Sequence, residues 1–261
     1  MIELSNVAYA YEGDFTALRD ITLKIGAGES VALLGSNGCG KSTLLKIICG
    51  VLTADSGHYR FNGDEISKKT LADASFSKAF HRKVGFVFQN SETQLFCATV
   101  ADEIAFGPRQ MGLSDAQVAE RVADCLELLG LNGFECRAPH RLSGGEKKKT
   151  AIAAVLAMNP DVLVLDEPMN GLDPRTERWL AGFLKDLTNA GKTVITSTHD
   201  LELVREISAR AALFDENHTL AADGETATVL ADVELLRRVN LVDKFYHKHG
   251  TGDHTHFHTH N

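Results

Sequence analysis

Residues 30–43 read SVALLGSNGCGKST, and this stretch decides the fold. Its first five residues, Ser30 to Leu34, form a short apolar run of the kind found in strands buried on both faces. The next eight, Gly35 to Ser42, match the pattern G-x-x-x-x-G-K-[ST]. A helix is predicted from about Lys41 to Cys49. The sequence therefore predicts a phosphate-binding loop between a buried strand and a helix.

The chemistry of this loop explains its residues. Glycines let backbone N–H groups curl round phosphate groups as an anion nest, and the positive end of the helix dipole faces the same charge. The ammonium of Lys41 is expected to reach the β- and γ-phosphates of ATP, and the hydroxyl of Ser42 is expected to bind Mg²⁺. The residues predicted to bind nucleotide here are Gly35, Ser36, Asn37, Gly38, Cys39, Gly40, Lys41, Ser42 and Thr43.

A second apolar run, Val162 to Leu165, ends in the two carboxylates Asp166 and Glu167. Ligands of open parallel sheets bind at the carboxyl ends of the strands. Asp166 is expected to hold Mg²⁺ through water. Glu167, facing the other side, is expected to orient or deprotonate the attacking water. Together with the loop, this pair predicts an ATPase.

The remaining pattern predicts an α/β protein with a mainly parallel sheet, because strands alternate with helices. The predicted strands are Ile2 to Tyr11, Ala17 to Ile25, Val84 to Phe88 and Thr193 to Thr196. The predicted helices are Asp115 to Leu129, Lys147 to Met158 and Arg175 to Asn189. The first two strands are expected to pair antiparallel. A helical subdomain at about residues 91–158 interrupts one domain spanning 1–240, and residues 241–261 form a histidine-rich tail.

Composition limits the class of protein. With 261 residues, 44% hydrophobic and 24% charged, the chain is predicted to fold around one large core without needing disulfides or a structural metal. A formal net charge of −8 argues against a nucleic-acid partner. No apolar run approaches the length of a membrane span, and the first residues lack a signal-peptide pattern, which predicts a cytoplasmic protein. The five cysteines are predicted to be free thiols, without disulfides or structural zinc.

The pentapeptide Leu142 to Glu146, LSGGE, resembles the LSGGQ signature of ATP-binding-cassette (ABC) ATPases, with Glu at its last position. The resemblance implies a P-loop NTPase core whose helical insertion carries the signature. In that family two cassettes meet head to tail, and each signature closes the ATP site of the other. It implies that Ser143, Gly144 and Gly145 contact the γ-phosphate across the interface. Serine and backbone donors at a helix N-terminus suit that charge.

Other family positions follow in order along residues 2 to about 240. The resemblance implies that Tyr11 stacks on adenine, with Tyr9 as the alternative, and that His199 contacts the γ-phosphate. It assigns Gln89 to the Mg²⁺ site, together with Ser42 and Asp166, and to the link with a membrane partner. It makes Glu167, His199, Gln89 and Lys41 the catalytic set.

Three further positions bear on these assignments. Asp173 is implied to face the partner cassette. Lys149 stands where the family more often has arginine, whose planar fork is lost here. Cys39 stands where serine is commoner, and it is predicted to be an alkylation-sensitive thiol that ATP shields.

The chain has one cassette, no heptad insertion and no fused membrane span, which favours a separate subunit of an importer. The stretches Val84 to Pro108 and Leu142 to Pro174 resemble the ATPase subunits of energy-coupling-factor importers, most closely those for cobalt and nickel. This resemblance implies a membrane scaffold, a substrate-capturing membrane subunit and a peripheral place on the cytoplasmic face of the membrane. It also implies a groove beside Gln89 that receives a scaffold helix. The candidate contacts in that groove are Glu92, Asp102 and Glu103, which are equally typical of solvated carboxylates.

The tail carries an alternating set of histidines. In an extended chain, alternation puts four imidazoles on one face, and they are mostly neutral at pH 7. They are His254, His256, His258 and His260. Imidazole binds Ni²⁺, Co²⁺, Zn²⁺ and Cu²⁺, so the tail is predicted to buffer or sense such a metal. A polar tail without function, or a tag remnant, is the alternative.

The sequence thus predicts an ABC ATPase that powers import of nickel or cobalt through a separate membrane complex. Three other functions remain open: an importer for another substrate such as a vitamin, a soluble ABC protein acting on macromolecules, and a metal-storing protein with a vestigial cassette.

Overall fold

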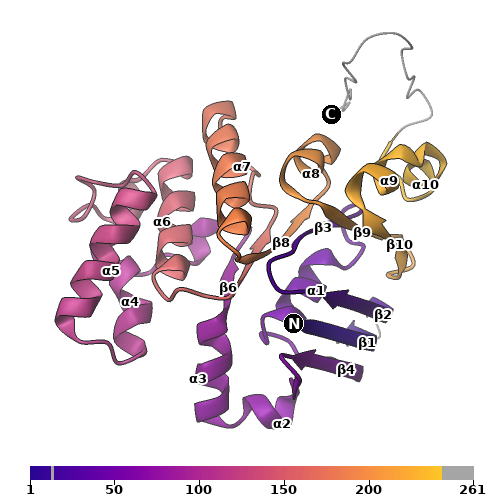
Figure 1. Cartoon of the computed structure of the whole chain (residues 1–261), viewed down its shortest axis with the longest axis horizontal. Helices are drawn as coiled ribbons and strands as arrows, with labels where there is room; N and C mark the ends of the chain where they lie inside the picture. The colour runs from indigo at the N-terminus through magenta and orange to yellow at the C-terminus, as the bar shows by residue number, and fades with distance from the viewer. Residues whose placement is uncertain (13–14, 243–261) are drawn as a thin grey trace.

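The computed structural model describes residues 1–12 and 15–242, and its core is a six-stranded sheet in the order β10-β9-β3-β8-β7-β6 (Figure 1). All neighbours are parallel except β10, which pairs antiparallel with β9 at one edge. Every residue of β3, β7 and β8 is buried, as the short apolar runs predicted. The strands are β3 (Ser30–Leu34), β6 (Val84–Val87), β7 (Val162–Asp166), β8 (Thr193–Thr198), β9 (Arg210–Phe214) and β10 (Leu220–Glu225).

A second, antiparallel sheet has the order β2-β1-β4-β5. Its strands are β1 (Ile2–Tyr11), β2 (Phe15–Ile25), β4 (Ser56–Phe61) and β5 (Asp64–Glu65). The predicted antiparallel pairing of the first two strands is confirmed, whereas β4 and β5 were not predicted. The α/β fold class with an antiparallel N-terminal sheet is therefore correct.

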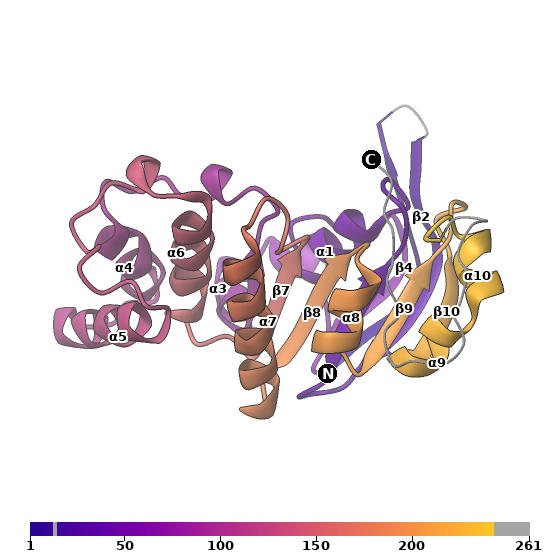
Figure 2. The same ribbon diagram turned by 90° about the horizontal axis from the view of Figure 1, so that it is seen from above.

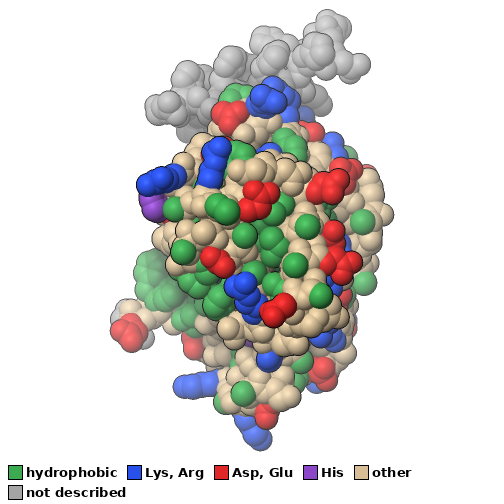
Figure 3. All heavy atoms as spheres, turned by 90° about the vertical axis from the view of Figure 1, so that its left-hand side faces the viewer, with side chains coloured by type: hydrophobic (Ala, Val, Ile, Leu, Met, Phe, Trp, Pro, Cys, Tyr) green, Lys and Arg blue, Asp and Glu red, His purple; other side chains and the backbone are tan. Residues whose placement is uncertain are grey.

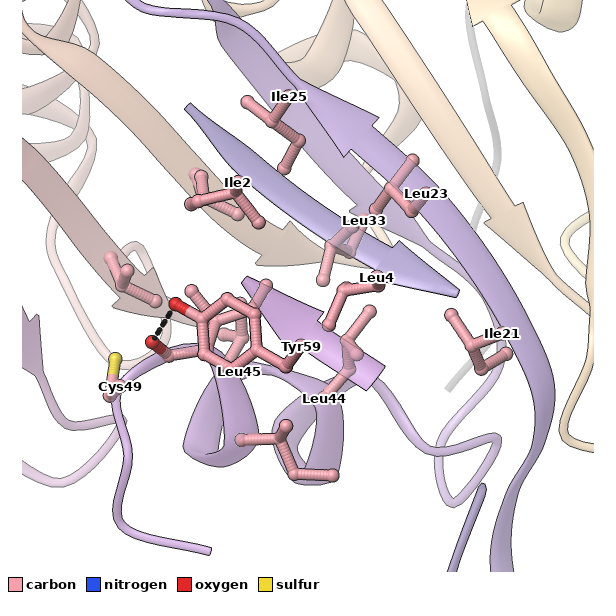
Figure 4. Close-up of a cluster of buried hydrophobic side chains, with 14 of the residues drawn as sticks. Ile2, Leu4, Ile21, Leu23, Ile25, Leu33, Leu44, Leu45, Cys49 and Tyr59 are labelled. Carbon is pink, nitrogen blue, oxygen red and sulfur yellow. Dashed lines mark hydrogen bonds between the residues drawn. The ribbon is translucent and has the colours of Figure 1, made fainter. Parts of the chain in front are cut away.

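Helix α1 (Lys41–Ile48) packs between the two sheets. The alternation of β3 shows this directly, because Val31 and Leu33 belong to the same apolar cluster as Leu44 and Leu45 of α1. Figure 4 shows this cluster, with side chains from both sheets around Leu44 and Leu45. In this cluster the buried hydroxyl of Tyr59 donates to the backbone oxygen of Ile48 at 2.8 Å. The loop before α1 is thus anchored on a rigid strand and a rigid helix.

The opposite face of the large sheet is covered by helices of the second half of the chain (Figure 2). They are α7 (Pro174–Asn189), α8 (Leu201–Ile207), α9 (Thr226–Ala231) and α10 (Val233–Arg238). Ala32 and Leu34 of β3 face this side and pack with residues of α8, α9 and α10. Of these helices only α7 was predicted. No helix in the described ranges is long and apolar enough to cross a membrane.

Between β6 and β7 the chain is helical, with no strand from residue 91 to 158. This part holds η1 (Ser91–Thr93), α4 (Val100–Gln110), α5 (Asp115–Leu128), η2 (Pro139–Arg141) and α6 (Gly144–Leu156). It projects to one side of the sheets (Figure 1). Two short helices that were not predicted, α2 (Lys68–Leu71) and α3 (Ala74–Lys83), lead from the antiparallel sheet to β6.

Helix α6 starts at Gly144, three residues before the predicted start at Lys147. The reason is a capping box: the Ser143 hydroxyl accepts from the N–H of Glu146, and the Glu146 carboxylate accepts from the N–H of Ser143 at 2.7 Å. The last residue of the signature therefore has a structural task. The hydrogen bond from the Ser143 backbone lowers the pKa of the Glu146 carboxyl.

Candidate nucleotide-binding site

The loop from Gly35 to Lys41 depends on backbone conformations that favour glycine. Gly38 and Gly40 have φ angles of 84° and 111°, in the region where a side chain is strained. A Cβ on Gly40 would lie 2.3 Å from the backbone oxygen of Ala17. The loop therefore passes against β2 at a distance that only glycine permits. Lys41 follows as the first residue of α1, and its Nζ donates to the oxygens of Gly35 (2.7 Å) and Ser36 (3.0 Å).

The carboxylates at the end of β7 lie beside this loop. The Ser42 hydroxyl donates to Oδ1 of Asp166 at 3.0 Å, and Nζ of Lys41 lies 3.9 Å from Oε1 of Glu167. Both carboxylate residues are almost buried, at 6% and 9% exposed. A hydroxyl and a carboxylate oxygen brought together in this way are ligands of the kind that Mg²⁺ prefers. The residues present therefore fit the predicted metal.

Glu167 and His199 form a pair. Nδ1 of His199 lies 3.1 and 3.2 Å from the two carboxylate oxygens of Glu167. His199 follows the last residue of β8, and its side chain is 54% exposed, so it is not a core histidine. Glu167 has a φ of 41°, which is unusual for a residue with a side chain. The structure thus brings together Lys41, Ser42, Asp166, Glu167 and His199, as the sequence predicted.

Of the two tyrosines considered for adenine, Tyr11 is the more exposed, and its hydroxyl contacts the start of α1. Its hydroxyl is 3.2 Å from that of Thr43, and the residue is 38% exposed. The Tyr9 ring packs edge-on against Tyr11, with 5.0 Å between the ring centroids. The geometry favours Tyr11 as the exposed aromatic face beside the phosphate loop.

Gln89 lies just beyond β6, and its side chain is exposed. A lysine of α6 holds its backbone by a hydrogen bond. Nζ of Lys148 donates to the oxygens of Phe88 (3.2 Å) and Gln89 (3.0 Å). Lys148 is 3% exposed, and burial lowers the pKa of its ammonium to about 8, although nearby Asp166 acts to raise it. Sequence reasoning missed this residue. The run of three lysines at 147–149 was its only local signal.

The signature residues lie apart from the phosphate loop of the same chain. Ser143 and Gly144 are exposed at the start of α6, and in the described part of the chain no hydrogen bond joins them to residues 35–43. An exposed helix N-terminus with a serine is a site that a second molecule can reach. Asp173, predicted to face a partner, caps α7 by accepting from the N–H groups of Arg175 and Thr176.

Two expectations were wrong. Glu103 is 3% exposed, and its carboxylate accepts from the backbone N–H groups of Phe96 and Cys97 at 3.0 and 2.6 Å. It braces the loop before α4 and does not present a charge to a partner. Cys39 is 2% exposed, and burial raises the pKa of its thiol, so it does not have the reactivity predicted for it.

The cysteines, Lys149 and the histidines of the tail are the remaining predicted positions. The five cysteines, all within the described residues, are free. Nζ of Lys149 lies 4.1 Å above the centroid of the Trp179 ring, a cation–π contact. The histidines at 254–260 lie outside the described residues.

The chain is similar in sequence to known ATP-binding proteins. The family model described as "ABC transporter" matches residues 18–170. The nickel import ATP-binding protein LarO of Lactiplantibacillus plantarum is 44% identical over 223 residues, which is 85% of this chain and 92% of LarO. An energy-coupling factor transporter ATP-binding protein, EcfA of Methanothermobacter thermautotrophicus, is 43% identical over 92% of this chain and 76% of its own length.

Two solved structures have the same fold. CbiO1 from Clostridium perfringens, described as part of the ABC transporter complex cbiONQ, is 34% identical with a TM-score of 0.79, covering 92% of this chain and 94% of that one. The cassette MJ0796, solved as a dimer in a post-hydrolysis state bound to ADP and phosphate, is 29% identical with a TM-score of 0.78, covering 87% and 99%. This chain therefore belongs to the ABC transporter family, as one of its ATP-hydrolysing cassettes.

Proposed function

We propose that this chain works as a cassette dimer that powers import of nickel or cobalt through a separate membrane complex, from the cytoplasmic face of the membrane. The observation that carries the metal assignment is the 44% identity, over 85% of this chain, with a protein named for nickel import. The similarity to EcfA and to cbiO1 supports an importer of the energy-coupling-factor type.

The site residues support one division of labour in hydrolysis. Ser42, Asp166 and Gln89 would hold Mg²⁺, which when bound would supply positive charge to offset that of the triphosphate. Lys41 and the N–H groups of its loop bind the phosphates. Glu167, next to Asp166, directs water at the γ-phosphate and takes its proton, and His199 holds the Glu167 carboxylate in position.

The partner cassette completes each site. Ser143 to Gly145 of one chain are proposed to face the phosphate loop of the other. Their exposure at the start of α6 and the dimer formed by MJ0796 support this arrangement. Closing the interface excludes water and strengthens the electrostatic contacts to phosphate.

A groove of about 620 Å³ between α4 and α5 is our candidate for docking the membrane scaffold. Of the residues expected in such a groove, Asp102 lines it, whereas Gln89, Glu92 and Glu103 do not. Its floor is apolar, with Ala105, Val118 and Leu126 among its residues. Four carboxylates and only one cation also line it: Asp102, Asp115, Glu127 and Glu135 against Arg109. Figure 3 faces the side on which α4 and α5 lie, and apolar side chains gather at its middle among acidic ones. The charge balance fits an amphipathic scaffold helix that carries a basic residue.

Filling the groove tests this placement. Ala119→Trp puts an indole among the lining residues and is expected to weaken the complex with the membrane subunits at least about tenfold. ATP turnover by the isolated chain should stay unchanged. Ala116→Trp, also exposed on α5 but outside the lining, is the control. Co-purification of the membrane subunits measures the effect, and recovery of the complex at the parental level with Ala119→Trp would rule this groove out.

We further propose that His254, His256, His258 and His260 of the tail bind the imported metal as a buffer. The alternation of histidine along the last residues supports the proposal. A chain cut after residue 240 is therefore one arm of the experiment below.

Cellular nickel and cobalt content tests the function as a whole. Cells that lack this chain are complemented with the parental sequence, with Glu167→Gln or with the shortened chain, and both metals are measured by elemental mass spectrometry. The parental and shortened chains should restore one metal, and Glu167→Gln should not. The purified shortened chain should bind less of that metal than the full chain. If the parental chain changes neither metal, the metal assignment is wrong and a vitamin importer becomes the leading alternative.

A further inference from the structure

Ser197 belongs to no recognised sequence motif, and it is hydrogen-bonded to both acidic residues of the site. It lies in β8, is 0% exposed and donates from Oγ to Oδ1 of Asp166 at 2.5 Å. The same Oγ accepts from the backbone N–H of Glu167 at 2.9 Å. A hydroxyl has one proton to donate and lone pairs to accept with, so it can make both bonds at once.

The register of the sheet places the Ser197 hydroxyl beside Asp166 and Glu167. Strands β7 and β8 are parallel neighbours, and Asp166, the last residue of β7, is paired with Ser197. The chain then leaves the strand at Glu167, whose positive φ is strained for a residue with a side chain. The N–H of Glu167 is held there by the hydroxyl of Ser197 and also by its backbone oxygen, at 3.1 Å.

We infer that Ser197 is a positioning residue of the ATP site, which fixes the carboxylate that holds the metal and the backbone of the residue that directs water. Asp166 has two hydroxyl donors on the same oxygen, from Ser42 and Ser197. Ser42 is itself a proposed metal ligand, whereas Ser197 is buried behind the carboxylate. Outer partners of this kind orient a ligand and tune its affinity for metal. The inference rests on the proposed roles of Asp166 and Glu167.

The neighbouring residue provides a matched control. Thr196 is also 0% exposed in β8, and adjacent residues of a strand point to opposite faces. Its hydroxyl is buried without a hydrogen-bond partner among the described residues. Thr196→Val therefore removes a buried hydroxyl from the same strand and keeps its shape, without touching either carboxylate.

The test measures metal binding directly. Manganese, a paramagnetic stand-in for Mg²⁺, is titrated into the full chain with a non-hydrolysable ATP analogue and followed by electron paramagnetic resonance. Ser197→Ala is expected to lower the manganese affinity about 10- to 100-fold and to raise the Mg²⁺ concentration needed for half-maximal ATPase activity. Thr196→Val should leave both quantities at the parental values. Thermal unfolding of both variants shows that each is folded.

Each outcome decides the matter. Parental manganese affinity in Ser197→Ala overturns the inference, as does an equal loss in Thr196→Val, which would assign the effect to packing of β8. If the parental chain itself fails to bind manganese with the analogue, the proposed metal site is wrong, and the inference about Ser197 is wrong with it.

Discussion

Glu167→Gln is expected to bind ATP and almost stop hydrolysing it. The amide keeps the shape of the side chain, and its oxygen can still accept a hydrogen bond from His199, but it cannot take a proton from water. Loss of a general base costs about 10²- to 10⁴-fold in rate. Glu167 is 9% exposed at the end of β7, so solvent has little access to replace it. Phosphate release measures the rate.

The same variant should accumulate as a nucleotide-bound dimer, because closure no longer ends in hydrolysis. Size-exclusion chromatography with and without ATP detects that dimer. Glu120→Gln, at an exposed position of α5, is the control and should turn over ATP as the parental chain does. Parental turnover in Glu167→Gln would remove Glu167 from the catalytic role.

The parts of the fold that sequence predicted are those whose signal is local. Residues 31–34 and 162–165 are apolar throughout, because strands inside a parallel sheet are covered on both faces. By contrast, in β4 only Tyr59 and Phe61 are buried, and the other four residues are exposed. So few buried positions give no period to detect.

The parts of the site that sequence missed are contacts between distant residues. Lys148 and Gln89 are 59 positions apart, and Ser197 is 31 positions from Asp166. Each contact is set by how helices and strands pack, which local pattern does not record. The same limit explains Glu103: its place on α4 is typical of a surface carboxylate, and it is the preceding loop that folds over it.

The roles given to the signature came from resemblance, and the structure adds a physical reason for its unusual last residue. Glu146 closes a capping box with Ser143, which a glutamine can also do. A carboxylate there also places negative charge next to the serine proposed to meet the γ-phosphate. The capping box therefore stabilises α6, and in the proposed dimer its carboxylate would weaken phosphate binding electrostatically.

Gly40→Ala is expected to destabilise the chain and abolish ATP binding. The left-handed φ of 111° costs a residue with a side chain about 1–2 kcal/mol. The added Cβ would also lie 2.3 Å from the Ala17 oxygen and 2.9 Å from a methyl of Leu18, and overpacking of this kind costs about 1–3 kcal/mol more. The loop can avoid the clash only by moving away from β2, which displaces Lys41 at the same time. Denaturant unfolding and nucleotide titration measure the two effects.

Gly38→Ala separates the two causes. Gly38 has a comparable φ of 84°, but a Cβ there meets nothing within 4 Å. The Gly38→Ala chain should therefore lose only the stability that backbone strain costs, about 1–2 kcal/mol. The contact between the loop and β2 should stay in place. Equal losses in the two variants would show that backbone strain alone governs the loop. A Gly40→Ala chain with parental stability and ATP affinity would mean that the loop is not held against β2. A larger loss in Gly40→Ala is expected, because the Ala17 oxygen belongs to the backbone of a paired strand and cannot move aside as the end of a flexible side chain would.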